Sequence, residues 1–149
     1  MRKVILGIAV LAFAISAYAQ ATTGIAWADR NIGVNTRGNV TAVDFWVAAT
    51  DAGIYGQFAY LEAAAPAVRI YMNRFDLFQC DGQRVLIGGH GYVNGTPRLV
   101  LFAMEDNFWG PDFFSIAAFH PISGNLLYDR WGTLVGSKGI LCDGPGGGE

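Results

Sequence analysis

Histidine and cysteine are scarce in this chain, which has two of each among 149 residues. Two histidines exclude a metal site built from three histidines, and neither cysteine has a second cysteine or a histidine at the spacing of a zinc motif. The sequence also lacks a Gly-x-Ser-x-Gly motif, the serine elbow of the α/β-hydrolases. These absences favour a protein without enzymatic activity.

Charged residues are also few, at 15% of the chain, with twelve acidic and ten basic residues. Removal of the first 19 residues would take away Arg2 and Lys3, leaving eight basic residues and a net charge of −4. Nucleic-acid-binding proteins usually carry a basic patch that neutralises phosphates. We therefore expect no nucleic-acid partner.

The longest charge-free apolar run is too short for a membrane-spanning helix. Residues 4–17 contain no charge, but this run falls short of the roughly 20 residues that a spanning helix needs. Arg2 and Lys3 precede it and Ala17-Tyr18-Ala19 follows it, an order typical of a secretory signal. We expect residues 1–19 to be a cleavable signal peptide, cut between Ala19 and Gln20. The protein would then be secreted or periplasmic, without a permanent membrane anchor.

The two cysteines, Cys80 and Cys142, lie outside that segment, and each ends an apolar run and precedes Asp-Gly. An even pair in an oxidising compartment most often forms a disulfide. We expect a structural Cys80–Cys142 disulfide, with a reactive or metal-binding pair as the alternative.

Apolar residues alternate with period two along most of the remaining chain, and turn residues separate the runs. The clearest strand places Thr41, Val43, Phe45, Val47 and Ala49 on one face. Strands recur every 8 to 15 residues or so, and no window after Gln20 has helical spacing. This pattern predicts one all-β domain with about 8 to 9 strands, an antiparallel β-sandwich or, as the alternative, a flattened β-barrel.

The expected boundaries are an N-terminal lead-in over residues 20–37 with at most one short strand, a β-domain over 38–142, and a disordered glycine-rich tail over 143–149. Asp81-Gly82 and Asn94-Gly95 predict tight hairpin turns. Gly88-Gly89-His90-Gly91 interrupts a strand-like run, which indicates a bulge, a closely approaching backbone or, as the simplest explanation, a ring packed over glycine.

Three oxygen-bearing side chains surround the Gly110-Pro111 turn, namely Asp106, Asn107 and Asp112. Calcium takes six to eight oxygen ligands, so these residues together with backbone carbonyls could form a calcium site. Asp and Asn also cap turns without any metal. Turn capping is the favoured interpretation and calcium the alternative, and we expect no other cofactor.

Large aromatic side chains are the strongest indication of binding. Trp46 falls on the strand face opposite Phe45, and Trp109 lies in a loop beside Phe108. Exposed rings mark surfaces that bind proteins or sugars. We therefore predict a binding surface that includes Trp46, Phe108 and Trp109, with an extracellular protein or glycan as partner; the competing interpretation is that these rings are buried.

A small secreted hydrolase of unrecognised type is the enzymatic alternative. His90 or His120 would have to share an exposed pocket with a carboxylate, or two carboxylates would have to flank a groove. Asp44, Glu62, Glu105 and Asp106 are candidates only as carboxylates on strands or strand ends, where solvated faces normally carry such residues.

Several sequence segments resemble those of the post-COAP domain, a β-rich module of exported prokaryotic proteins. They are the run from Gly89 to Gly95, the block from Asp106 to Ile116, Tyr128, and the run from Gly132 to Gly136. In the middle block, the family's pattern falls on Asp106, Gly110, Asp112, Phe114 and Ile116. The resemblance implies an extracellular sandwich-like module without established enzymatic activity, and it names no ligand. We expect an exported, non-enzymatic β-domain with a binding, adhesion or structural role, or else a calcium-stabilised extracellular module.

Overall fold

A computed structural model describes residues 21–143 of the chain. The expected signal peptide, with its cleavage point between Ala19 and Gln20, lies outside the described residues, as do residues 144–149 of the expected tail. Asp143, which was assigned to that tail, is the last residue of a strand.

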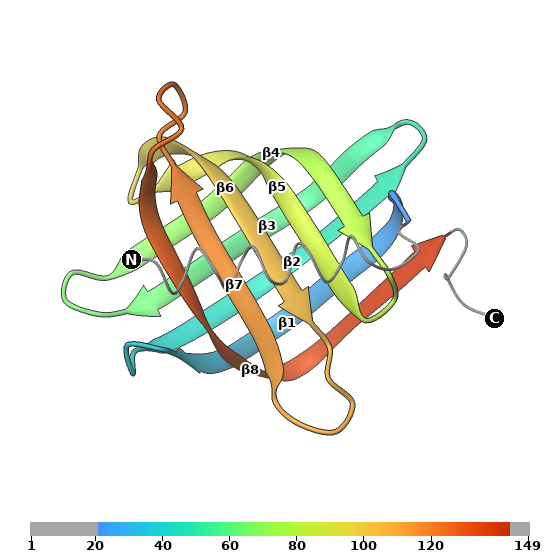
Figure 1. Ribbon diagram of the computed structural model, residues 1–149, viewed down its shortest axis with the longest axis horizontal. Coiled ribbons are helices and arrows are strands. Elements are labelled where there is room, and N and C mark those ends of the chain that lie inside the picture. Colours follow the sequence, from blue (N-terminus) through green and yellow to red (C-terminus); the bar gives the residue numbers. More distant parts are fainter. Residues whose placement is uncertain (1–20, 144–149) are drawn as a thin grey trace.

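Eight antiparallel strands form one closed barrel in which every strand pairs with its neighbour in sequence and the last pairs with the first (Figure 1). The described residues contain no helix, so the all-β class and the strand number are confirmed. Of the two predicted architectures, the structure has the barrel. The strands are β1 (Thr23–Asn35), β2 (Val40–Thr50), β3 (Gly53–Ala63), β4 (Val68–Cys80), β5 (Arg84–Val93), β6 (Thr96–Glu105), β7 (Asp112–Phe119) and β8 (Leu126–Asp143).

Two long strands, β4 and β8, each connect two sets of strands that run in different directions. β4 pairs with β3 from Val68 to Met72 and with β5 from Ile70 to Cys80. Likewise, β8 pairs with β7 up to Leu134 and with β1 from Gly132 onward. Figure 1 shows the two sets of strands running in different directions. A strand that passes from one set to the other closes edges that a sandwich would leave open.

The N-terminal segment is part of the barrel rather than a lead-in. β1 has 13 residues and pairs along its length with β2 on one side and with β8 on the other. Its mixture of small and polar residues conceals this role, because its inward positions include Ala26, Ala28 and Asn31, all 0% exposed. After Gly124 the chain forms one continuous strand of 18 residues, β8.

The period-two pattern of β2 matches the structure. Its five predicted core residues, from Thr41 to Ala49, are all buried. Inside the barrel, the Phe102 ring centroid of β6 lies 5.3 Å from that of Phe45 and 4.9 Å from that of Phe58. These rings connect opposite walls of the barrel, so the interior is filled with side chains.

The turn predictions are also confirmed. Asn94 and Gly95 both have positive φ angles of 49° and 83°, the combination that a two-residue hairpin requires. Between β4 and β5, the Asp81 carboxylate accepts hydrogen bonds from the backbone N–H groups of Gln83 and Arg84 at 3.0 and 2.8 Å.

The glycines of β5 serve close backbone approach, so the preferred explanation of a packed ring was wrong for this run. A Cβ on Gly89 would lie 1.9 Å from the carbonyl oxygen of Arg74, and one on Gly91 would lie 1.8 Å from that of Tyr71. The pairing of β4 with β5 shifts register twice beside this run. Ring packing over glycine occurs instead at Gly139, which lies under the indole of Trp27.

Candidate functional site

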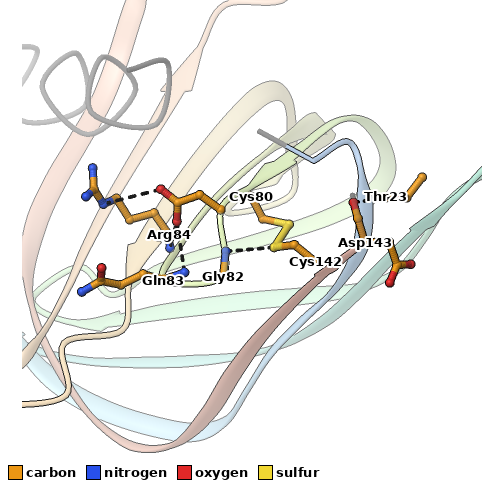
Figure 2. The surroundings of a disulfide bond; sticks show 8 residues. Thr23, Cys80, Gly82, Gln83, Arg84, Cys142 and Asp143 are labelled. Atoms are coloured by element: carbon orange, nitrogen blue, oxygen red, sulfur yellow. Dashed lines mark hydrogen bonds and ion pairs between the residues drawn. A yellow bond between two sulfur atoms is a disulfide. The ribbon is translucent and has the colours of Figure 1, made fainter. Parts of the chain in front are cut away.

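The predicted disulfide is present and joins β4 to β8 at one end of the barrel (Figure 2). Cys80 and Cys142 have their Cα atoms 6.1 Å apart. Cys80 also exchanges two backbone hydrogen bonds with Ala21, and the Gly82 N–H lies 3.1 Å from the Cys142 sulfur. A disulfide is consistent with an oxidising compartment. Its buried position and these neighbours make it a structural crosslink.

The three residues of the calcium prediction meet at the β6–β7 loop, where Asn107 and Asp112 cap the turn. The Asn107 N–H donates to Asp112 at 2.7 Å, and the Trp109 N–H donates to Asn107 at 3.3 Å. The second oxygen of Asp112 pairs with the Lys138 ammonium. A calcium ion would have to displace that ammonium. Among residues 21–143, no group of three or more His, Cys, Asp or Glu could hold a metal, and calcium binding stays a prediction.

Asp106 lies close to Asp112 in this loop. Burial of Asp106 raises its pKa, and the neighbouring Asp112 carboxylate raises it further, while Lys138 opposes both. Asp106 therefore holds its proton to a higher pH than a solvated aspartate does. The loop thus places two neighbouring carboxyl groups beside the Lys138 ammonium.

The predicted aromatic residues are exposed but do not form one surface. Trp46 is 44% exposed on the outer face of β2, whereas Phe108 is 74% and Trp109 98% exposed in the β6–β7 loop. Phe108 borders a hollow of about 610 Å³ at the disulfide end, next to Asp81 and Leu141. The chain thus has two separate aromatic surfaces.

Trp46 belongs to a hollow of about 560 Å³ on the outer wall formed by β2, β3 and β4. Tyr71 of β4, which is 51% exposed, borders the same hollow. Between them β3 contributes Gly56 and Ala59, which are too small to fill the space. Asp44, Gln57 and Asn73 add polar groups to its lining.

Sequence reasoning did not include Tyr71 in the binding surface, although a signal was present. In the sequence, Ile70 and Met72 alternate with the polar Arg69 and Asn73, so Tyr71 shares the polar face of a strand. An aromatic ring at an outward strand position is the same signal that identified Trp46.

The histidines occupy different environments. His90 Nδ1 lies 2.8 Å from the Asp76 carboxylate, and the Arg74 guanidinium lies against the same ring. Burial raises the pKa of Asp76, but hydrogen bonds from His90 and Arg74 outweigh it and lower the pKa overall. His120 Nδ1 instead accepts hydrogen bonds from the backbone N–H groups of Ile122 and Ser123, both at 3.2 Å, and so caps a turn.

Glu62 lies inside the barrel and is 0% exposed, so its assignment to a solvated strand face was wrong. Tyr128 donates to its carboxylate at 2.5 Å and Asn35 at 2.8 Å. Asn39 and Arg130 lie 2.6 and 3.1 Å from the same group. These donors satisfy a charge that burial would otherwise make costly. The cluster ties β1, β3 and β8 together.

The titration of this cluster reflects both effects. Burial raises the pKa of Glu62, but the hydrogen bonds from Tyr128, Asn39, Asn35 and Arg130 outweigh it and bring the pKa to about 2. Burial raises the pKa of Tyr60 to about 12, and it likewise raises that of Tyr128. At neutral pH the cluster therefore holds one carboxylate and two neutral phenols.

No family model, curated protein or solved structure matches this chain. The resemblance to the post-COAP domain stays a prediction. Residues 21–143 include no helix of the length and apolarity needed to cross a membrane.

Proposed function

We propose that this protein is an exported, non-enzymatic β-barrel that binds an extracellular partner through aromatic side chains on its outer surface. The observation that carries the proposal is the position of Trp46, whose exposed ring stands with that of Tyr71 beside a hollow of about 560 Å³. Exposed rings beside a hollow provide a large contact area when a partner covers them. Because buried side chains fill the interior, the partner would bind outside the barrel.

Two features support action outside the cytoplasm. The basic start, short apolar run and small residues before Gln20 follow the secretory pattern. The Cys80–Cys142 disulfide suits an oxidising compartment. The partner is then an extracellular glycan or protein.

A binding screen with matched variants tests the proposal. The mature protein is applied to a glycan array and to the exported proteins of its host, alongside Trp46→Ala, Trp109→Ala and the control Ile122→Ala. Ile122 is 91% exposed in the β7–β8 turn, so its truncation reports loss of exposed apolar area alone. We expect Trp46→Ala to weaken the binding and Ile122→Ala to leave it unchanged. Equal binding by all four proteins would contradict a role for the aromatic surfaces.

A hydrolase remains the second candidate because of the His90–Asp76 pair, which adjoins a hollow of about 230 Å³ lined by His90 and Arg98. A histidine held by a carboxylate is half of a nucleophile-activating arrangement. No serine, threonine or cysteine side chain within residues 21–143 hydrogen-bonds to His90. Hydrolysis of ester or glycoside substrates that disappears in His90→Gln would favour this candidate over the binding function.

A further inference from the structure

Three hollows with shared lining residues lie across the outer wall of the barrel. They measure about 310 Å³ over β1–β4, 560 Å³ over β2–β4 and 230 Å³ over β4–β6. The first two share Asp44, Ala59 and Tyr71, and the second and third share Asn73. We call this feature the outer groove. It crosses the strands, which are successive neighbours in the wall (Figure 1).

Strand register places aromatic rings along the groove. Tyr71 of β4 pairs with Ala59 of β3 on one side and with Tyr92 of β5 on the other, and Tyr92 pairs with Pro97 of β6. Neighbouring strands lie about 4.8 Å apart, so these side chains form a row perpendicular to the strands. Trp46 lies two strands from Tyr71 and outside this row, because it pairs with Gln57 of β3, whereas Ala59 pairs with Asp44. The result is an elongated groove with a ring at intervals.

The groove is rich in arginine although the whole chain carries a net charge of −2. Its lining includes one carboxylate, that of Asp44, and four of the eight basic residues beyond position 20, Arg30, Arg69, Arg74 and Arg98.

Two of these arginines, Arg69 and Arg98, have no carboxylate partner among residues 21–143. Arg30 pairs with Asp29 at 3.5 Å and Arg74 with Asp76 at 3.3 Å. Arg69 and Arg98 lie on β4 and β6, separated by β5, which places them at least about 10 Å apart. This surface therefore complements a ligand with negative charges at intervals.

The polar groups between the rings indicate which anionic polymer fits. Asp44 can only accept hydrogen bonds when ionised, and Gln57 and Asn73 can both donate and accept. Sugar hydroxyls supply donors and acceptors to such groups, and sugar rings stack on aromatic faces. Single-stranded DNA also stacks on aromatic rings, but its phosphates would meet the Asp44 carboxylate without donating a hydrogen bond to it. The combination favours a saccharide.

We propose that the outer groove binds an acidic polysaccharide of the polyuronate type, with sugar rings on Trp46, Tyr71 and Tyr92 and carboxylates at Arg69 and Arg98. The proposal rests on the binding function above and names the class of ligand for the Trp46 surface.

Calorimetric titration with alginate, a polyuronate, tests this directly. Dextran serves as the neutral polysaccharide and single-stranded DNA as the other anionic polymer. Arg69→Gln and Arg98→Gln each remove one groove charge. Arg37→Gln is the matched control, because Arg37 is exposed in the β1–β2 turn, outside the groove.

We expect alginate to bind more tightly than dextran or DNA, and its binding to weaken when NaCl is raised. Arg69→Gln and Arg98→Gln should each raise the Kd about threefold to tenfold, as exposed charged contacts do, while Arg37→Gln has no effect. Circular dichroism of the three variants should match that of the unmodified protein, since Arg37 and Arg69 are exposed and Arg98 is partly exposed.

Other outcomes separate this proposal from the binding function. Equal affinity for dextran and alginate, with loss only in Trp46→Ala, would overturn the anionic ligand and keep the aromatic binding site. Tighter binding of DNA, or equal weakening by Arg37→Gln, would also overturn the polyuronate proposal. Absence of binding to either polysaccharide would overturn it too, and the array screen would then decide the binding function separately.

Discussion

Replacing Glu62 with glutamine should remove the part of the pH-dependent stability that this carboxylate supplies. The folded pKa of Glu62 is about 2, against an ordinary value of 4.5. Because one pKa unit corresponds to about 1.4 kcal/mol, the ionised carboxylate contributes about 3 kcal/mol to the free energy of unfolding at neutral pH. At pH 7, Glu62→Gln loses this contribution and leaves the Arg130 guanidinium, 12% exposed, without its partner. We expect a total loss of about 3 to 5 kcal/mol at that pH.

The direction of the pH dependence follows from which state binds the proton first. The folded pKa lies below the unfolded one, so the unfolded chain takes up the proton first as pH falls. The stabilisation is therefore complete above pH 4.5 and is lost as pH falls to about 2. The glutamine variant cannot be protonated at this position, so protonation of residue 62 no longer lowers its free energy of unfolding as pH falls.

Urea unfolding at several pH values between 7 and 2.5 measures the effect. The difference in free energy of unfolding between the unmodified protein and Glu62→Gln should shrink by most of 3 kcal/mol or so over this range. Asp51→Asn is the control, since Asp51 is exposed in the β2–β3 turn. A difference that stays constant from pH 7 to pH 2.5 would refute the argument that hydrogen bonding holds Glu62 ionised.

Three further predictions concern the crosslink, a glycine and metal removal. Replacing both Cys80 and Cys142 by alanine should lower the free energy of unfolding by about 4 kcal/mol, because the bridge spans 62 residues. Thiol titration of the unmodified protein, unfolded without a reducing agent, should find no free thiol. Two free thiols would contradict the crosslink. Gly89→Ala should lower the free energy of urea unfolding by about 2 to 3 kcal/mol, because the new Cβ would lie 1.9 Å from the carbonyl oxygen of Arg74. An unchanged urea midpoint would show that β4 and β5 can move apart at this point without loss of stability. Addition of EDTA should leave the thermal midpoint unchanged, because Lys138 already pairs with Asp112; a lower midpoint would instead establish calcium binding.

Local features of the fold could be predicted from the sequence because they depend on neighbouring residues. The alternation from Thr41 to Ala49 identified the buried face of β2, and Asn94-Gly95 identified the hairpin turn between β5 and β6. The choice between sandwich and barrel depends on whether β1 pairs with β8, which lies 97 to 120 residues further along the chain. No local pattern in β1 encodes that pairing, and its small inward residues weakened even the strand prediction.

The candidate site was only partly predictable for the same reason. Alternation alone placed Trp46 outward, and that is where it lies. The outer groove needs the register of four further strands, which sets Ala59 between Asp44 and Tyr71 and sets Tyr92 beside Tyr71. Glu62 shows a signal that was present but misjudged, because it shares strand parity with Phe58 and Tyr60. Its burial depends on donors from β1 and β8 that local sequence does not bring together.

An NMR titration with a uronate oligosaccharide tests the central claim most directly. The claim is that the partner binds outside the barrel, in the outer groove. We expect chemical-shift changes to concentrate at the Trp46 indole N–H and at the amides of Tyr71, Tyr92 and Arg98, and to leave the loop of Phe108 and Trp109 unaffected. Changes confined to that loop, or no changes at saturating ligand, would contradict the claim.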